Sequence, residues 1–157
     1  LDVHLGKLAR RLRLLGFDCR YRNDYDDDRI VRIALAEERI ILTRDRGLLK
    51  RKQVRSGCLV NADRPEEQLR AVASRYALAG RIRPLSRCPI CNGALQPVAK
   101  EQVADQLQPG TRLHHDVFQR CADCGQVYWH GSHAEKISQW IEGLRKDLDH
   151  ARDLPGR

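Results

Sequence analysis

The residues with the clearest chemistry in this chain of 157 residues are four of its six cysteines. They form two Cys-x-x-Cys pairs, Cys88 with Cys91 and Cys121 with Cys124, and 29 residues separate the two pairs. Each pair can direct two thiolates at one ion, and two pairs complete the tetrahedral four-sulfur shell that Zn²⁺ favours. Because four protein ligands leave no open position, we expect a structural zinc site and look elsewhere for catalysis.

Redox pairs or disulfides are the alternative interpretation of these cysteines. A redox pair usually begins a helix that follows a strand. Here the turn residues Asn92-Gly93 and Gly125 come directly after the second cysteine of each pair, which favours zinc knuckles. The remaining thiols, Cys19 and Cys58, are expected to be ordinary half-buried residues. Either His114 or His115, which lie between the pairs, could replace a cysteine ligand, although four cysteines suffice.

Acidic side chains form a second candidate site. They lie where the strands of a predicted parallel sheet would end: Asp2, the neighbours Asp27 and Asp28, and Asp45. Ligands of open parallel sheets bind at this edge. Carboxylates that converge there could hold Mg²⁺ or Mn²⁺, hard ions that activate water and stabilise the leaving oxygen in phosphodiester hydrolysis. We therefore predict that these four residues are catalytic metal ligands.

Each acid also has a structural alternative. Helix capping could account for at least one of Asp27 and Asp28, and also for Asp2. Asp45 could simply pair with one of its neighbours, Arg44 or Arg46. The metal site becomes the better interpretation only when the acids are considered together, at matching strand ends in a basic domain.

The positive charge of the chain lies in its first part. Residues 1–87 hold 21 Lys and Arg against 12 Asp and Glu, whereas residues 88–157 hold 8 against 9. A basic surface beside a zinc module indicates a polyanionic partner, most simply nucleic acid, over a charge that serves only solubility. Tyr128 is expected to lie in the ribbon core. Trp129 could be a core residue or stack on a base, and His133 could begin the final helix or contact a phosphate. The candidate RNA-binding residues are Lys7, Arg10, Arg44, Arg46, Trp129 and His133.

Helices and short apolar strands alternate in the first half of the chain, which predicts an α/β domain with a parallel sheet. We expect helices over 5–16, from about 27 and from 65, a helical turn over 48–52, and strands over 18–22, 39–43 and 58–60. The ribbon is expected to have strands over 95–98, 117–118 and 127–129, followed by a final helix that begins with the capping box Ser132 to Glu135 and packs its apolar stripe back on the protein. The predicted domains are a nuclease domain 1–84, a zinc ribbon with a C-terminal helix 85–150, and a flexible tail 151–157.

Several stretches of this sequence are distinctive: Asp2 to Gly16, the Asp-rich run 24–28, Leu42-Thr-Arg-Asp-Arg46, and the ribbon stretches 86–92, 121–125 and 128–133. Together they resemble the Mut-seven C-terminal RNase domain family, and the resemblance covers the chain to about residue 145. It implies a PIN-like three-layer fold with an appended zinc ribbon, and a metal-dependent ribonuclease activity. Asp2 and Asp45 match the family's acids, Asp27 and Asp28 are favoured for the middle acid among Asp24 to Asp28, and Asp63 is a weak fourth candidate.

The expected activity is hydrolysis of RNA with Mg²⁺ or Mn²⁺, with zinc in a structural role. The alternatives are a non-catalytic RNA-binding module associated with tRNA or ribosomes, and a toxin-type PIN protein held by an antitoxin. No stretch is long and apolar enough for a membrane span, and free thiols suit a reducing cytoplasm. We therefore expect a cytoplasmic protein without a signal peptide. The chain lacks methionine and opens at Leu1, so we expect a longer polypeptide in which a first strand, and in some relatives a ubiquitin-like domain, precedes Asp2.

Overall fold

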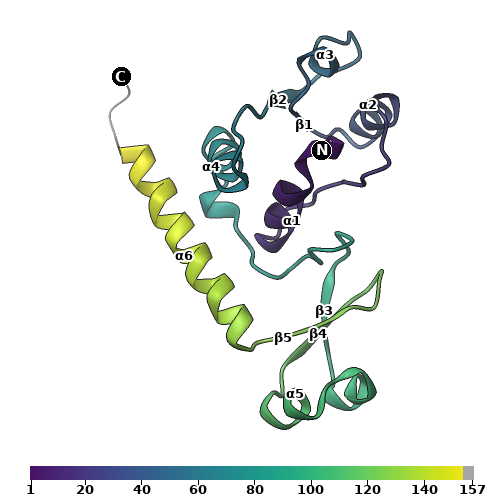
Figure 1. The fold of residues 1–157 in the computed structure, drawn as a ribbon, viewed down its shortest axis with the longest axis vertical. Coiled ribbons are helices and arrows are strands. Elements are labelled where there is room, and N and C mark those ends of the chain that lie inside the picture. Colours follow the sequence, from purple (N-terminus) through teal and green to yellow (C-terminus); the bar gives the residue numbers. More distant parts are fainter. Residues whose placement is uncertain (154–157) are drawn as a thin grey trace. The chain divides into compact units, whose positions relative to one another are not determined.

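The computed structural model describes residues 1–153, and of these the side chains of 132, 133 and 149–153 are left aside. The chain divides into two compact units (Figure 1). Unit 1 contains Leu1–Leu12 and Asp18–Leu78, and unit 2 contains Arg13–Phe17 and the chain from Ala79 onward. The domain limits expected from the sequence stay predictions.

Unit 1 is a mixed α/β structure built on two parallel strands. β1 (Ile41–Thr43) pairs with β2 (Gly57–Leu59) in the register Ile41 to Gly57, Leu42 to Cys58 and Thr43 to Leu59. Short helices connect and flank the strands. They are η1 (Val3–Leu5), α1 (Gly6–Leu14, whose last residues belong to unit 2), α2 (Asp27–Ala36), α3 (Arg46–Leu49) and α4 (Pro65–Arg75).

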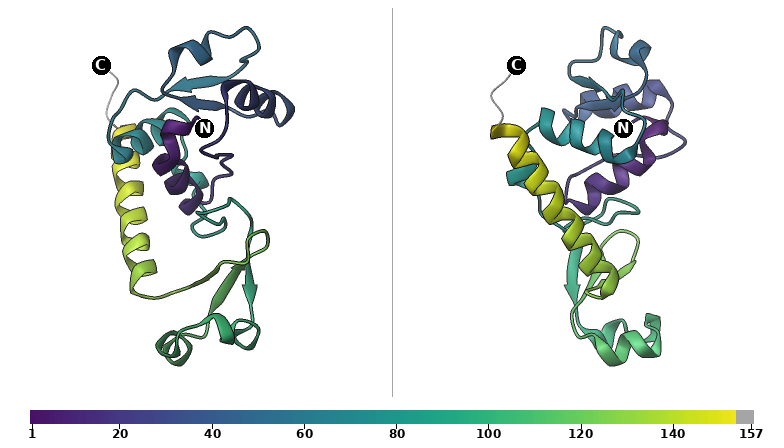
Figure 2. Two further views of the ribbon diagram at one scale, coloured as in Figure 1. Left: turned by 45° about the vertical axis from the view of Figure 1, so that its right-hand side comes forward. Right: turned by 60° about the vertical axis from the view of Figure 1, so that its left-hand side comes forward.

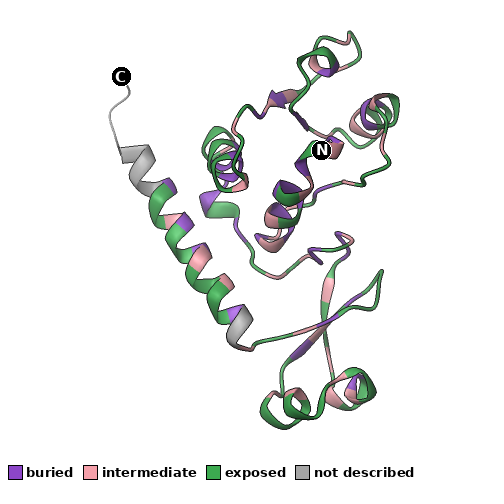
Figure 3. Ribbon diagram, in the orientation of Figure 1, coloured by how far each residue is buried: buried purple, intermediate pink, exposed green. Residues whose placement is uncertain are grey.

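Apolar residues at helical spacing hold α2 and α3 against the strands. Ile30 and Val31 of α2 form a buried cluster with Ile41 of β1 and Leu48 of α3. Figure 3 shows that α2 carries both buried and exposed residues, as expected for a helix with one face on the core. All three residues of β1 are buried, as expected for a parallel strand covered on both faces. The loops at the end of β1 are therefore fixed by a packed core.

The structure departs from the sequence prediction at residues 18–22, which do not form a strand. The first two residues of the chain lie beside this segment, because the amino group of Leu1 donates to the carbonyl of Arg20 at 2.9 Å. Side chains support this segment in an irregular conformation: Arg39 pairs with Asp18 at 2.8 Å, and the hydroxyl of Tyr21 donates to the carbonyl of Val3 at 3.1 Å. The expected three-layer arrangement of the PIN-like fold also stays a prediction.

Unit 2 contains an antiparallel sheet with the order β3-β4-β5 (Figure 2). Its strands are β3 (Leu95–Val98), β4 (Phe118–Cys121) and β5 (Val127–Trp129). The polar stretch between β3 and β4 forms short helices that pack against the sheet through Val103, which lies in one buried cluster with Phe118 and Val127. The helices of this part are η2 (Ala79–Arg81), η3 (Lys100–Gln102), η4 (Ala104–Gln106) and α5 (Pro109–His114).

The final helix, α6 (Ser132–Asp153), buries one apolar stripe. Ile141, Leu144 and Leu148 lie on this stripe and are buried, which agrees with the expected packing of the helix back on the protein. Arg145 of the same helix donates to the carbonyl of Ile82 at 3.3 Å, beside η2. The helix continues past residue 150, where the predicted tail begins. Within the described residues, no helix combines the length and hydrophobicity that a membrane crossing requires.

The close packing of Gly16, which follows α1, against the main chain of Arg83 can be tested. Gly16 has φ +90°, and a Cβ atom there would lie 2.1 Å from the carbonyl oxygen of Arg83. We predict that Gly16→Ala lowers the free energy of unfolding by at least about 2 kcal/mol, because it adds both backbone strain and a clash with main chain. Gly80→Ala is the matched control, since its Cβ would meet nothing within 4 Å. Urea denaturation of both variants measures the difference, and equal losses would contradict the packing described.

Candidate functional site

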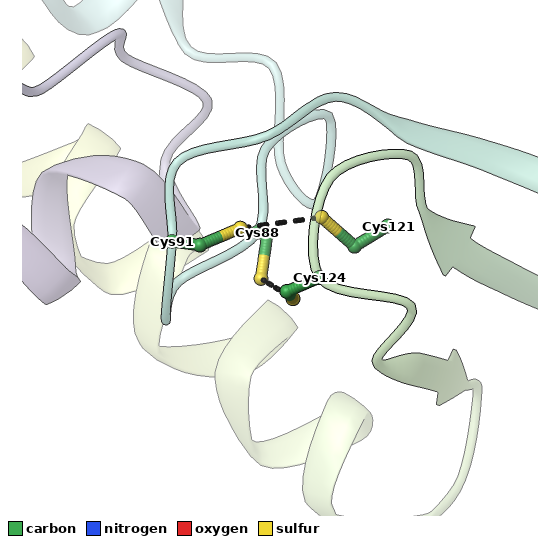
Figure 4. Close-up of side chains that lie close together, drawn as sticks. All are labelled: Cys88, Cys91, Cys121 and Cys124. Carbon is green, nitrogen blue, oxygen red and sulfur yellow. Dashed lines mark hydrogen bonds between the residues drawn. The ribbon is translucent and has the colours of Figure 1, made fainter.

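The four paired cysteines lie together in unit 2 (Figure 4). All four sulfur atoms are within 4.8 Å of one another, with Cys88 Sγ 3.7 Å from Cys124 Sγ and Cys91 Sγ 3.3 Å from Cys121 Sγ. Sulfurs at the corners of a tetrahedron around Zn²⁺, each about 2.3 Å from the ion, are about 3.8 Å apart. The cluster is therefore compatible with a structural zinc site. Cys19, Cys58, His114 and His115 are not part of it.

The two pairs have the same backbone structure, which explains why the turn residues follow each second cysteine. Asn92 and Gly125 have φ values of +79° and +74°. Their N–H groups donate to the carbonyls of Cys88 and Cys121, at 2.9 and 3.1 Å respectively. Only residues that tolerate a left-handed conformation close such turns without strain. The pairs are thus knuckles that direct two sulfurs each toward one point.

The electrostatics of the cluster differ from one thiol to the next. Burial raises the pKa of Cys88, but hydrogen bonds from the Tyr128 hydroxyl and from nearby backbone amides outweigh it and lower the pKa to about 7. Burial raises the pKa of Cys91 to about 12; the N–H of Gly93 opposes this increase, and the neighbouring thiols add to it. Four negative sulfurs at these distances require a cation to hold their charge.

Two residues outside the knuckles contact them, and the sequence analysis assigned neither to this site. The hydroxyl of Tyr128 lies 3.0 Å from Cys88 Sγ, so this tyrosine is more than ribbon core. Arg13, which is 4% exposed, donates to the carbonyl of Ile90 at 2.7 Å, inside the first knuckle. A tyrosine on the strand after the second knuckle is a signal that could have been found, whereas the contact of Arg13 spans 77 residues and has no local signature.

Asp2 is the most buried of the predicted catalytic acids, with 3% of its surface exposed. Its Oδ1 accepts from the N–H of His4 at 2.9 Å, so Asp2 caps η1, which was its alternative role. Its Oδ2 accepts from the hydroxyl of Thr43 and from the N–H of Arg44, the latter at 2.6 Å. Three protein donors thus occupy this carboxylate and tie the start of the chain to the end of β1.

Asp45 is connected to Asp2 through Thr43. The N–H of Asp45 donates to Thr43 Oγ1 at 2.9 Å, and that hydroxyl donates to Asp2. Asp45 itself caps α3, since its Oδ1 accepts from the N–H of Gly47 at 2.6 Å. It does not pair with its arginine neighbours: Arg44 instead forms an ion pair with Asp63 at 2.6 Å. The second carboxylate oxygen of Asp45 has no hydrogen-bond donor among the described residues.

Asp27 and Asp28 occupy the first turn of α2, but neither caps the helix. Asp26 is the cap, because its side chain accepts from the N–H of Arg29 at 2.7 Å. The capping alternative is therefore wrong for Asp27 and Asp28. Both instead face the guanidinium of Arg51, at 3.6 and 2.5 Å respectively.

The acids do not form a compact group of three or more ligand atoms; within the described part of the chain, only the cysteines do so. Their donor type nevertheless fits Mg²⁺ or Mn²⁺, since such ions are commonly held by one or two carboxylates and keep several waters. Asp45 offers a free oxygen, and Asp28 is 79% exposed. A hard cation would therefore find carboxylates accessible from solvent at these positions.

Three of the predicted RNA-binding cations are unpaired. Among the residues that the structure describes, Lys7, Arg10 and Arg46 have no acidic partner within ion-pairing distance. Arg44 is engaged by Asp63. Trp129 is 39% exposed and lines a shallow pocket of about 500 Å³ with several amide side chains, among them those of Gln106, Gln108 and Gln126. The side chain of His133 lies outside the described residues.

Comparison with known proteins gives one match. The family model described as Mut7-C RNAse domain matches residues 1–141. No curated protein and no solved structure matches the chain. The resemblance inferred from the acidic and cysteine motifs is thus confirmed over nine-tenths of the sequence, and the chain belongs to the Mut7-C RNAse domain family.

Proposed function

We propose that this protein is a metal-dependent ribonuclease that hydrolyses phosphodiester bonds in RNA. The observation that carries the proposal is the match of residues 1–141 to an RNase family, which suggests a nuclease-like role. It is supported by the carboxylates at the end of β1 and at the start of α2, whose donor type suits Mg²⁺ or Mn²⁺. We further propose a PIN-like arrangement for unit 1, which its parallel strands and alternating helices support.

In this proposal the acids have different tasks. A divalent cation at these carboxylates would make a water molecule nucleophilic and offset charge on the leaving oxygen. Asp45 would hold the cation through its free oxygen while its other oxygen keeps the loop in place at Gly47. Asp27 and Asp28, in the first turn of α2, would contribute further carboxylate ligands to the cation. Asp2 has three protein donors, so its main contribution would be to position Thr43 and, through it, Asp45.

The basic residues of unit 1 would bind the substrate backbone. Lys7 and Arg10 of α1 and Arg46 of α3 can each contact a phosphate without first leaving an ion pair. Arg44 would have to leave Asp63, so we assign it a smaller share. In unit 2, Trp129 could stack on an unpaired base, and the polar side chains beside it could contact the base edge. His133 remains a candidate phosphate contact.

We also propose that unit 2 binds one zinc ion through Cys88, Cys91, Cys121 and Cys124. The sulfur distances and the matching knuckle backbones support this. With four thiolate ligands the ion would have no position open to substrate. Its role would be to hold the two knuckles together and so stabilise the fold of unit 2.

A non-catalytic RNA-binding module, associated with tRNA or ribosomes, is the second candidate. A specific observation favours it: the acids do not form a compact group within the described residues, and Arg51 is paired with two of them. Such a protein would use the same unpaired cations and exposed Trp129 to bind RNA without cleaving it.

The decisive substitution is Asp45→Asn. Asparagine is as good a helix cap as aspartate, so α3 should persist while the charge is removed. With Mn²⁺ or Mg²⁺, we expect the rate of cleavage of labelled single-stranded and structured RNAs to fall at least about 100-fold. Asp105→Asn, an exposed acid in η4, is the control and should cleave normally. Tight RNA binding without cleavage by any form, including one with the preceding chain restored, would favour the binding module.

The zinc site is tested by element analysis of the purified protein. We expect one zinc per chain, lost in Cys121→Ser together with the cooperative thermal unfolding of unit 2, because a missing thiolate leaves the shell incomplete. Cys58→Ser replaces a buried thiol outside the cluster and should retain the metal. Equal zinc contents in the two variants would contradict the proposed site.

The phosphate contacts are tested by the salt dependence of RNA binding, measured in the Asp45→Asn background so that substrate stays intact. Each of Arg10→Gln and Arg46→Gln should reduce the slope of log K against log salt by about 0.7 for single-stranded RNA. Arg22→Gln removes the same charge from a residue already paired with Asp24 at 2.9 Å, and should change the slope less. Three identical slopes would show that the unpaired cations have no special role.

A further inference from the structure

Arg51, which follows α3, has a position that the sequence analysis did not foresee. Its Nη1 lies 2.5 Å from Asp28 Oδ1 and its Nη2 lies 3.6 Å from Asp27 Oδ2. One guanidinium therefore spans the two carboxylates that begin α2. Because a fork of N–H donors matches carboxylate oxygens, both acids are held toward the same point.

Asp45 belongs to the same group of charges. The hydrogen bond to Asp28 raises the pKa of Arg51, desolvation opposes this shift, and the charges of Asp28, Asp27 and Asp45 then add to it. Three of the four acids proposed for the metal site thus raise the pKa of the same arginine. Asp2, which has protein donors on both oxygens, is the exception.

We propose that Arg51 is a built-in counter-ion that competes with the divalent cation for the carboxylates of Asp27 and Asp28. This inference rests on the proposed function and concerns how the same site takes its metal. A carboxylate oxygen that accepts from the guanidinium at 2.5 Å has given one of its lone pairs to that bond. The positive charge of Arg51 also repels a second cation at this distance.

The geometry allows the exchange. The side chains of Arg51 and Asp27 are 36% and 44% exposed, and Asp28 is more exposed still, so the ion pairs form in contact with water. Such pairs are weak, and a long arginine side chain can turn away without disturbing buried structure. Arg51 would therefore lower the affinity of Asp27 and Asp28 for the metal by a modest factor. In the absence of the metal it would offset the repulsion between these two carboxylates.

The test measures Mn²⁺ binding to the zinc-loaded chain by the paramagnetic resonance of free Mn²⁺, without any reaction. Arg51→Ala should bind Mn²⁺ roughly three- to tenfold more tightly than the unchanged protein. Arg51→Gln is the second variant, in case loss of the longer side chain affects folding, and should also bind more tightly. Lys52→Ala removes the same charge from the next residue, which is exposed, and should stay within about twofold of the unchanged protein.

The outcomes separate this inference from the function on which it rests. Tighter binding in both Arg51 variants, abolished by adding Asp45→Asn, supports the competition. Binding that depends on Asp45 but is equal or weaker in the folded Arg51 variants overturns the inference and leaves the metal site intact. If no protein shows Mn²⁺ binding that depends on Asp45, the proposed metal site itself is overturned.

Discussion

Repulsion between like charges that the fold brings together is the constraint on which both sites depend. In unit 2, four sulfurs lie within 4.8 Å of one another. In unit 1, the carboxylates of Asp27 and Asp28 face the guanidinium of Arg51, and the charge of Asp45 also raises the pKa of this arginine. A positive charge beside each group offsets this repulsion, strongly for the clustered sulfurs and modestly for the exposed carboxylates. The donors differ in softness, since thiolates suit zinc and carboxylates suit Mg²⁺ or Mn²⁺. In the proposed function, this difference in donor type would let the two sites bind different ions.

The buried polar chain of Asp2, Thr43 and Asp45 is the second organising feature of unit 1. An almost fully buried carboxylate is costly unless its oxygens are hydrogen-bonded, and here backbone and hydroxyl donors satisfy both. Thr43 is 0% exposed and connects the two acids, because its hydroxyl donates to one and accepts from the N–H of the other. A side chain at the surface is thereby positioned by one in the core.

The sequence was most informative where the structural signal is local. Cysteine spacing and the turn residues at Asn92 and Gly125 predicted a four-sulfur cluster, and the β-branched run before Asp45 predicted β1. Residues 18–22 have the composition of a strand but do not form one, and contacts with distant residues such as Arg39 are not visible in that composition. The pairing of Arg51 with Asp28 spans 23 residues, and it depends on how α2 and α3 pack around Ile41. Tertiary contacts of this kind have no period or spacing that a single sequence displays.

The four acids of the proposed metal site differ in exposure, so a substitution at each of them tests a different property. Asp2 is 3% exposed, whereas the Asp28 side chain is 79% exposed. Asparagine at position 2 would replace one of the two accepting oxygens with an NH2 group that faces an existing donor, so a loss of activity there would follow from misfolding as readily as from metal loss. Asp45 is exposed, and one of its oxygens caps a helix while the other is free. Because asparagine can keep the cap, removal of the charge at Asp45 separates chemistry from stability.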